Sequence, residues 1–266
     1  MSAIDYDSID AWAPSLATAL HSHVPPSIWP ELKSARPEYV EDARRHLFEL
    51  TDREAVIETV IEWIQSNTLL TYHGSRLTDA DVASIRSVGL IPLKATERRN
   101  RILRALSSQP EWLSAAPRLE TALQAHGPGN AAGRREGEVH LTLSKAGLVS
   151  GFNHYLTHGA EFDQHVAHAL LGQDAVELLA RDGSSTLLQV AVPGALALEA
   201  AHPIFTLDDL RARGDVPNIV RQFLEAWSYR LAHPGFQPGT LKVDCGIRFR
   251  TTVPATWIVG VELLGV

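Results

Sequence analysis

A histidine and a glycine stand together in the segment Tyr72–Arg76, which reads Tyr-His-Gly-Ser-Arg. The His73 imidazole and the main chain at Gly74 could contact one flat, amide-bearing ligand, because glycine lets a ligand approach the backbone closely. The apolar pair 69–70 precedes this segment, and a helix-like stretch that ends at Gly89 follows it. We therefore expect a binding site at the end of a short strand.

A second histidine lies in the strand-like segment Glu138–Ser144. Side chains alternate between the two faces of a strand, so His140, Thr142 and Ser144 would share one face and the apolar residues between them the other. If the strand of His73 lies next to this one, the two imidazoles would face the same cleft. Each histidine taken singly is explained as well by a structural hydrogen bond.

The composition limits the classes of function. The chain has 266 residues, 45% of them hydrophobic, which is enough for a globular core. Its 24 basic and 31 acidic residues give a net charge of −7, which disfavours a general nucleic-acid surface but permits a local one. A single cysteine, Cys245, allows no intrachain disulfide, and in an apolar strand we expect its thiol to be inert. Without a leader-like start or a membrane-length apolar run, the sequence predicts a soluble, cytoplasmic protein.

The first part of the chain predicts helices before the first strand. Residues 1–38 carry five prolines among apolar residues, which favours an irregular, packed segment. Residues 38–66 show helical spacing with a helix start at Thr51-Asp52, so we expect two helices there. A strand over 69–72 would then lead to a helix over 78–88, capped by Thr78 and Gly89, and to an extended segment over 90–93.

The remaining chain predicts a mixture of helices and strands. Residues 94–126 favour two or three short helices, 127–137 a glycine-rich loop, and 146–171 helices broken near Gly159. Apolar residues four apart predict an amphipathic helix over 218–231. Strands are expected over 139–143, 187–192, 241–249 and 257–264. We therefore predict an α+β fold with a mixed or antiparallel sheet, divided into a helical N-terminal segment, 1–66, and a domain over 67–266.

Three short segments follow one another along the chain. The first is 72–76 followed by Gly89-Leu90, the second is 139–141 followed by Ser144-Lys145, and the third is 253–258 at the entry to the last strand. In this respect the chain resembles the ADP-ribosyltransferase-like superfamily, which includes poly-ADP-ribose polymerases and NAD-dependent RNA 2′-phosphotransferases. The resemblance covers residues 68–266, with insertions. It implies a split-sheet catalytic domain over 67–266 that uses NAD as a substrate.

The resemblance also implies roles for residues. His73 would hold the ribose next to the nicotinamide, and the Gly74 backbone would pair with the carboxamide. His140 matches the histidine of the RNA phosphotransferase branch, where polymerases have tyrosine, and would be the second catalytic residue. Arg76, or Arg248 and Arg250, could bind the pyrophosphate, because guanidinium matches phosphate oxygens. The residues expected to contact NAD are Gly74, Ser75, Arg76, Ser144 (carboxamide), and Phe152 and Tyr155 (ring stacking).

The chain departs from the family in its third segment. Transferring members have a glutamate shortly before the proline-containing turn, and residues 244–250 contain none. This departure argues against polymer formation, while Ile247 at that place is similar to the RNA phosphotransferase branch. We predict an enzyme that transfers ADP-ribose from NAD to a protein, nucleic-acid or small-molecule acceptor and releases nicotinamide. A non-catalytic module that binds NAD or ADP-ribose, an RNA 2′-phosphotransferase-like activity and a scaffold with a vestigial cleft stay open.

Four histidines raise the alternative of a metal site. His154, His158, His165 and His168 have helical spacings of four and three, which zinc ligands can use. Gly159 separates the two pairs and no zinc-protease motif is present, so we expect no metal. The glycine-rich loop at 127–133 lacks the Lys-Ser/Thr end of a phosphate-binding loop and is expected to be a plain loop.

Overall fold

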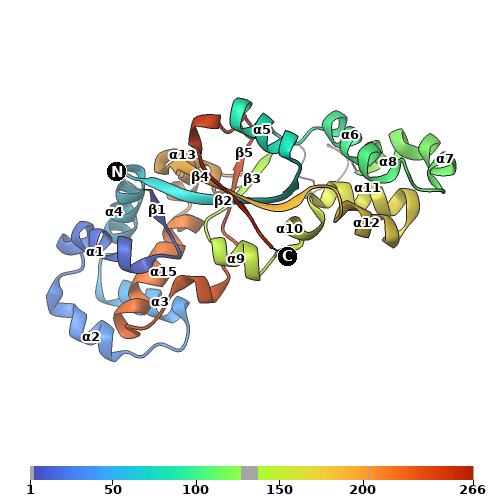
Figure 1. Cartoon of the computed structure of the whole chain (residues 1–266). Coiled ribbons are helices and arrows are strands. Elements are labelled where there is room, and N and C mark those ends of the chain that lie inside the picture. The colour runs from blue at the N-terminus through green and yellow to red at the C-terminus, as the bar shows by residue number, and fades with distance from the viewer. Residues whose placement is uncertain (1–2, 127–136, 203, 266) are drawn as a thin grey trace. The chain divides into compact units, whose positions relative to one another are not determined.

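The computed structural model describes residues 3–126, 137–202 and 204–265 and has an α+β architecture (Figure 1). Within these ranges six strands form one sheet in the order β5-β3-β2-β4-β6, and β1 pairs with β2. The strands are β1 (Ile4–Asp5), β2 (Thr68–Leu77), β3 (Val139–Thr142), β4 (Ser184–Pro193), β5 (Gly246–Phe249) and β6 (Ile258–Leu263). The predicted α+β class is confirmed, and the ADP-ribosyltransferase type of split sheet stays a prediction.

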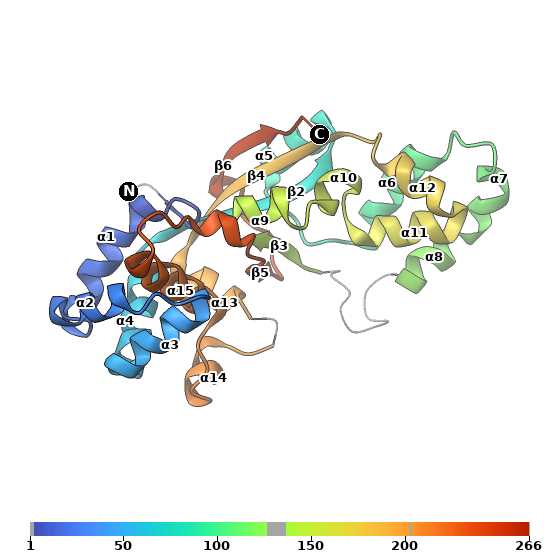
Figure 2. The same cartoon turned by 90° about the horizontal axis from the view of Figure 1, so that it is seen from below.

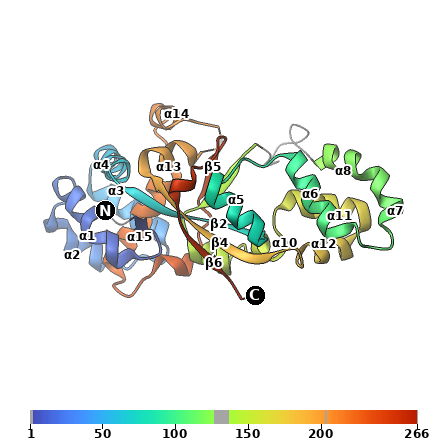
Figure 3. The ribbon, with the colours of Figure 1, turned by 45° about the horizontal axis from the view of Figure 1, so that its top comes forward.

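The sheet contains both strand directions. β1 is parallel to β2, whereas β4 and β6 run antiparallel with a register shift between Gln189 and Val190. Figure 3 shows β4 beside β6. β2 and β3, which carry the two predicted histidines, are neighbours.

The chain divides into two compact units. The first contains Met1–Thr71, Thr142–Gly151 and Ala191–Ile247, and the second contains Tyr72–Leu141, Phe152–Val190 and Arg248–Val266. The strands β2 to β5 each contribute residues to both units. The boundary expected between residues 66 and 67 stays a prediction.

Helices dominate the first unit. α15 packs against α2, α3 and α4, and its residues Ile219, Phe223 and Trp227 are buried as the sequence predicted (Figure 1). Since these residues repeat every fourth position, they form one apolar stripe. The helices are α1 (Ile9–Ala19), α2 (Trp29–Ser34), α3 (Val40–Leu50), α4 (Arg53–Gln65), α9 (Lys145–Ser150), α13 (Gly194–Ala200), α14 (Leu207–Ala212) and α15 (Asn218–Ala232), with short 3-10 turns at Leu20–Ser22, Pro26–Ile28 and Pro238–Leu241.

The prediction of an irregular segment over 1–38 is wrong, because α1 and α2 lie there. Pro26 and Pro30 stand in the first two positions of a 3-10 turn and of α2, where the chain needs no amide donor. Pro14 lies inside α1, and burial of the helix's apolar face offsets the hydrogen bond it removes. Proline therefore shapes these helices without preventing them.

The second unit contains a group of helices with its own apolar core. α11 packs against α6, α8 and α12, and α6 also packs against α8 and α12 (Figure 2). Ile102, Leu106, Val166 and Leu179 are fully buried in this core. The helices are α5 (Asp79–Val88), α6 (Ala95–Leu106), α7 (Trp112–Ala115), α8 (Leu119–His126), α10 (His154–His158), α11 (Glu161–Leu171) and α12 (Gln173–Leu179), with 3-10 turns at Ala116–Arg118 and Ala255–Trp257.

The predicted helix caps are confirmed. The Asp52 carboxylate accepts hydrogen bonds from the first amides of α4, and Thr78 and Asp81 form a reciprocal capping box at the start of α5. Gly89 ends α5 with a φ of +90°, and a Cβ there would lie 2.1 Å from the Val253 carbonyl oxygen. Glycine is required at this position by both the positive φ and the close approach.

Some predicted strands have other bounds. Of the extended segment expected over 90–93, Leu90 alone forms a bridge, with Val253. The strand expected over 241–249 begins at Gly246, because the chain before it includes a 3-10 turn. The break near Gly159 is confirmed, since α10 ends before it and α11 begins after it. The loop expected over 127–137 lies, apart from Gly137, outside the described residues.

Candidate functional site

The His-Gly segment lies inside β2. The strand continues to Leu77, so the prediction that it ends at Tyr72 is wrong. β2 has β3 on one side and β4 on the other. Backbone hydrogen bonds to these two strands keep β2 extended through its polar residues as well as its apolar ones. His73 and Gly74 are partly buried, and Ser75 is buried. The motif is thus fixed in the middle of the sheet rather than at a free strand end.

His73 is joined to the neighbouring strand by its side chain. Its Nδ1 lies 2.8 Å from the carbonyl oxygen of His140. A carbonyl only accepts hydrogen bonds, so Nδ1 donates the proton and Nε2 carries the lone pair of the neutral ring. Burial, and to a lesser extent the charge of Arg98, lowers the pKa of His73, while the bond to His140 opposes the shift. The imidazole is therefore held neutral and in one tautomer.

The side chain of His140 pairs with a carboxylate. Its Nε2 lies 3.0 Å from Oε2 of Glu138, two residues earlier on the chain. The Nε nitrogen of Arg250 lies 3.7 Å from the other oxygen of the same carboxylate. The Glu138 and His140 side chains are only 16% and 21% exposed, so water screens their interaction weakly. Glu138 was not predicted as a site residue, although its place two residues before His140 on the same strand face was a visible signal.

Arg76 is held by partners near β4. Its Nη1 donates to the Ser185 hydroxyl at 3.1 Å, and its Nη2 donates to the Gly183 carbonyl. Its Nε is buried and has no hydrogen-bond partner. The guanidinium would have to release one of these bonds or use Nε to bind pyrophosphate. Its expected role in NAD binding stays a prediction.

The predicted stacking residues stand just before and within α10. Phe152 is partly buried in the bend that precedes this helix. The Tyr155 hydroxyl donates to Oε1 of Glu161 at 3.1 Å, and its ring centroid lies 4.0 Å from that of His154. An aromatic face and a carboxylate are thus brought together at this end of α10. Stacking of either ring on nicotinamide stays a prediction.

Ser144 belongs to the first unit, whereas His73 and His140 belong to the second. It caps α9: its hydroxyl accepts a hydrogen bond from the Gly147 amide at 2.9 Å and donates one to Oδ1 of Asp7 at 2.8 Å. Thr142 and Ser144 are both buried, so burial does not alternate along this segment. The hydroxyl proton is committed to Asp7, and a role for Ser144 in binding a carboxamide stays a prediction.

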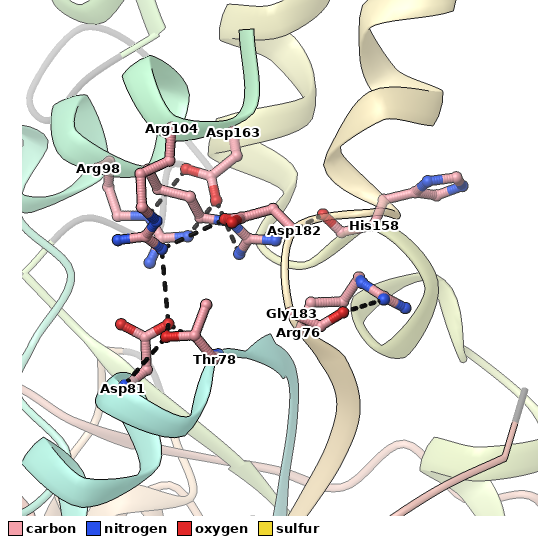
Figure 4. A network of polar contacts seen from close by, with 10 residues as sticks. Arg76, Thr78, Asp81, Arg98, Arg104, His158, Asp163, Asp182 and Gly183 are labelled. Atoms are coloured by element: carbon pink, nitrogen blue, oxygen red, sulfur yellow. Dashed lines mark hydrogen bonds and ion pairs between the residues drawn. The ribbon is translucent and has the colours of Figure 1, made fainter.

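The second unit contains a buried ion cluster that the sequence did not predict (Figure 4). The Asp163 side chain on α11 is fully buried and is bound by two arginines of α6. Arg98 donates from both Nε, at 2.8 Å, and Nη2, and Nη1 of Arg101 lies 3.2 Å from the carboxylate. Burial alone would lower the pKa of Arg98, but Asp163 raises it. Two fixed cations thus surround one anion.

The cluster extends from these residues to α5 and to the start of β4. Nη2 of Arg104 lies 3.2 Å from the Asp182 carboxylate and 3.5 Å from that of Asp81. Nη2 of Arg101 donates to the His158 carbonyl at 3.4 Å, and its guanidinium packs against Gly159, where a Cβ would lie 2.3 Å from Nη1. Arginines three residues apart on α6 were the visible signal. Their partners lie between 23 positions (Arg104 and Asp81) and 81 positions (Arg101 and Asp182) away, which no local pattern indicates.

The four histidines considered for zinc have other surroundings. His154 lies 3.1 Å from Glu161, and His165 stacks on His126 with ring centroids 5.7 Å apart. The Nδ1 of His158 is buried and unpaired. Across the part of the chain that the structure describes, no group of three or more His, Cys, Asp or Glu residues could hold a metal ion.

The remaining observations concern the single cysteine and membrane-spanning helices. Cys245 is buried, and burial raises the pKa of its thiol to about 12, so its thiolate is not a nucleophile near neutral pH. Among the described residues no helix is both long enough and apolar enough to span a bilayer.

No protein-family model, curated protein or solved structure matches this chain. The resemblance to ADP-ribosyltransferase-like proteins therefore depends on the residues of the chain itself.

Proposed function

We propose that this protein binds NAD and transfers its ADP-ribose group to an acceptor. The bond between C1′ of the ribose and the nicotinamide nitrogen breaks, and its electron pair leaves with neutral nicotinamide. C1′ then bonds to an oxygen or nitrogen of the acceptor, whose proton is released. The reaction develops positive charge on the ribose, so catalysis depends mainly on holding the ribose and orienting its hydroxyls.

The observation that carries the proposal is the bond between His73 and the main chain of His140. It joins the two residues assigned to catalysis, which are 67 positions apart, and it fixes the tautomer of His73. With Nδ1 protonated, Nε2 can accept a hydrogen bond from a ribose hydroxyl. The lowered pKa of His73 supports this role, because a protonated ring could not accept that bond.

The order of the strands supports the same proposal. The three segments that resemble the family lie far apart in sequence, and the first two occupy the neighbouring strands β2 and β3. β5, which precedes the third segment, lies on the other side of β3. The third segment itself leads into β6, which lies beyond β4 at the other edge of the sheet, so strand order supports a common site for the first two segments alone.

Two observations favour a binding module that has lost turnover as the second candidate. Residues 244–250 supply no glutamate to orient the 2′-hydroxyl of the ribose. The Ser144 hydroxyl and the terminal nitrogens of Arg76 are already bonded within the protein. Such a module would bind NAD or ADP-ribose without releasing nicotinamide. RNA 2′-phosphotransfer is a third candidate, favoured by His140 and Ile247 at the family positions.

Calorimetry and product analysis separate these candidates. The protein is titrated with NAD and with ADP-ribose, and then incubated with NAD labelled in both halves together with cell extract or 2′-phosphorylated RNA. Release of nicotinamide with label on an extract component supports transfer, and loss of the RNA phosphate supports the third candidate. Binding without release identifies the module. Absence of binding and of release in every mixture would contradict the proposal.

Matched variants link any activity to the site. His73→Ala removes the proposed ribose contact, so NAD affinity or turnover should fall at least tenfold, about 1.4 kcal/mol. Glu49→Gln is the control, since Glu49 pairs with His46 at 3.2 Å on α3 in the first unit. Equal NAD affinity and turnover in both variants would show that His73 is structural.

A further inference from the structure

The carboxylate of Glu138 is placed to control the protonation of His140. A carboxylate ion only accepts hydrogen bonds, so the 3.0 Å contact with Nε2 requires the proton to lie on that nitrogen. The lone pair of the neutral ring is then on Nδ1. A carboxylate behind an imidazole also stabilises the positively charged ring after it takes up a proton.

We propose that Glu138 is a positioning residue that acts through His140 and takes over part of the task of the glutamate missing from residues 244–250. This inference rests on the proposed ADP-ribosyl transfer. As C1′ bonds to the acceptor oxygen or nitrogen, the acceptor's proton passes to Nδ1 of His140. The Glu138 carboxylate balances the resulting charge, and the proton then leaves to water with no other reactant consumed.

The surroundings of three other carboxylates favour Glu138 for this task. Asp163 is fully buried between Arg98 and Arg101. Asp7 accepts from the Ser144 hydroxyl and from the Ala146 amide at the start of α9. Glu161 pairs with His154 and with the Tyr155 hydroxyl. Glu138 is the member of this set that contacts a histidine assigned to catalysis.

Arg250 refines the role of this carboxylate. Its Nε lies 3.7 Å from Oε1 of Glu138, while His140 contacts Oε2, so the two partners use different oxygens. The Arg250 side chain is 75% exposed, and water therefore weakens its hold on the carboxylate. Among the described residues, Glu138 contacts the His140 ring, Arg250 contacts Glu138, and His73 is bonded to the His140 main chain.

Nuclear magnetic resonance of ¹⁵N-labelled imidazoles tests the pairing without NAD. His140→Gln identifies the His140 signals in the wild-type protein. Those signals should show the Nε2-protonated tautomer, and Glu138→Gln should lower the pKa of His140 by about one unit, because the neighbouring negative charge is lost. Glu49→Gln should leave the His140 signals unchanged.

Turnover tests the consequence. Glu138→Gln should reduce nicotinamide release by about 10- to 100-fold with little change in NAD affinity, the usual effect of removing a partner that orients a reacting histidine. Glu49→Gln should retain wild-type turnover. Glu138→Asp keeps the charge on a shorter side chain and should recover part of the loss.

The outcomes separate this inference from the proposed function. A wild-type protein that neither binds nor cleaves NAD contradicts the function, while the imidazole spectra still decide whether Glu138 controls His140. Unchanged spectra in Glu138→Gln overturn the inference whether or not NAD is cleaved. Full turnover in Glu138→Gln also overturns it, and a loss confined to Glu161→Gln would assign the missing carboxylate to α11.

Discussion

The two units of the chain contain clusters of opposite chemistry. In the first unit, Phe223 packs against Tyr6, Trp12 and Trp63, with ring centroids 4.9 to 5.5 Å from its own. In the second unit, Asp163 is bound by two arginines of α6. Both clusters join segments that lie far apart in sequence. The difference lies in what happens when one member is removed, since an apolar cluster leaves a cavity and an ion cluster leaves unbalanced charge.

The aromatic cluster gains stability from buried area and ring geometry. Phe223 meets its three partners in edge-on arrangements, with interplanar angles of 77° to 85°. Such pairs contribute about 0.5–1.5 kcal/mol beyond the area they bury. The indole nitrogens of Trp12 and Trp63 donate to the Tyr6 carbonyl and to the Ser15 hydroxyl, so burial costs them no hydrogen bond.

The intact ion cluster contributes little net stability, but its hydrogen bonds and ion pairs require the charged groups to lie in specific positions. Moving charges out of water is costly, and their mutual attraction and hydrogen bonds only balance that cost. The Nε of Arg101 has no well-formed hydrogen bond, and the nearest carboxylate oxygen, on Asp182, is 3.4 Å away. The cluster therefore specifies how α6, α11 and β4 meet more than it strengthens their contact.

The largest expected effect comes from emptying the aromatic cluster. Phe223→Ala should lower the free energy of unfolding by about 4 kcal/mol, because it removes a buried ring and leaves a cavity. Urea unfolding measures the change. Ile204→Ala, at a side chain 78% exposed, is the matched control and should cost less than about 0.5 kcal/mol. A loss below about 1 kcal/mol for Phe223→Ala would show that the cluster is loosely packed.

The next effect comes from removing the central anion of the second unit. Asp163→Asn should lower the free energy of unfolding by about 3 kcal/mol, because Arg98 loses its buried carboxylate partner and Arg101 keeps only Asp182, 3.4 Å from its Nε. Asp208→Asn is the control, since Asp208 lies 3.3 Å from Arg211 but is 91% exposed, and its loss should cost no more than about 1 kcal/mol. Equal losses in the two variants would mean that water reaches Asp163.

These two clusters also show what the sequence could predict. The stripe of Ile219, Phe223 and Trp227 has a regular period, so its burial was predicted correctly. The caps at Asp52, Thr78 and Gly89 were equally local and are confirmed. The partners of Asp163 could not be predicted, because an ion pair between residues more than 60 positions apart leaves no periodic pattern in the sequence. Tertiary packing likewise overrode proline in α1.

For the candidate site the sequence predicted the residues better than their surroundings. The contact between the His73 ring and the His140 main chain follows from the adjacency of β2 and β3, and a common cleft for the two imidazoles stays a prediction. The strand end at Tyr72 was wrong because polar residues continue the strand when both of its edges are paired. The engagement of Ser144 by Asp7 was unpredictable, since 137 residues separate the two.

The smallest expected effect is a change in pH dependence at His73. Its pKa in the folded protein is lowered from 6.5, chiefly by burial, so the unfolded chain binds more protons as the pH falls below that value. The stability that comes from the neutral ring is therefore complete above about pH 6.5 and is lost as the pH falls through the lowered folded-state pKa. The contribution of His73 to stability therefore depends on pH, whereas the contribution of the aromatic cluster depends on packing.

The variant His73→Gln isolates the contribution of His73 protonation to the pH dependence of stability. Glutamine can donate to the His140 carbonyl but cannot titrate, so at about pH 8 the variant should lose less than about 1 kcal/mol of stability. Between about pH 7 and pH 5 the variant should lose less stability than the wild type, because it lacks the proton-linked penalty. Urea midpoints measured across this range provide the comparison, with His46→Gln on α3, a partly buried histidine outside the candidate site, as control. Parallel curves for wild type and His73→Gln would show that the folded protein leaves the His73 pKa at its ordinary value. That result would contradict the proposal that a neutral His73 ring accepts a hydrogen bond from the ribose hydroxyl.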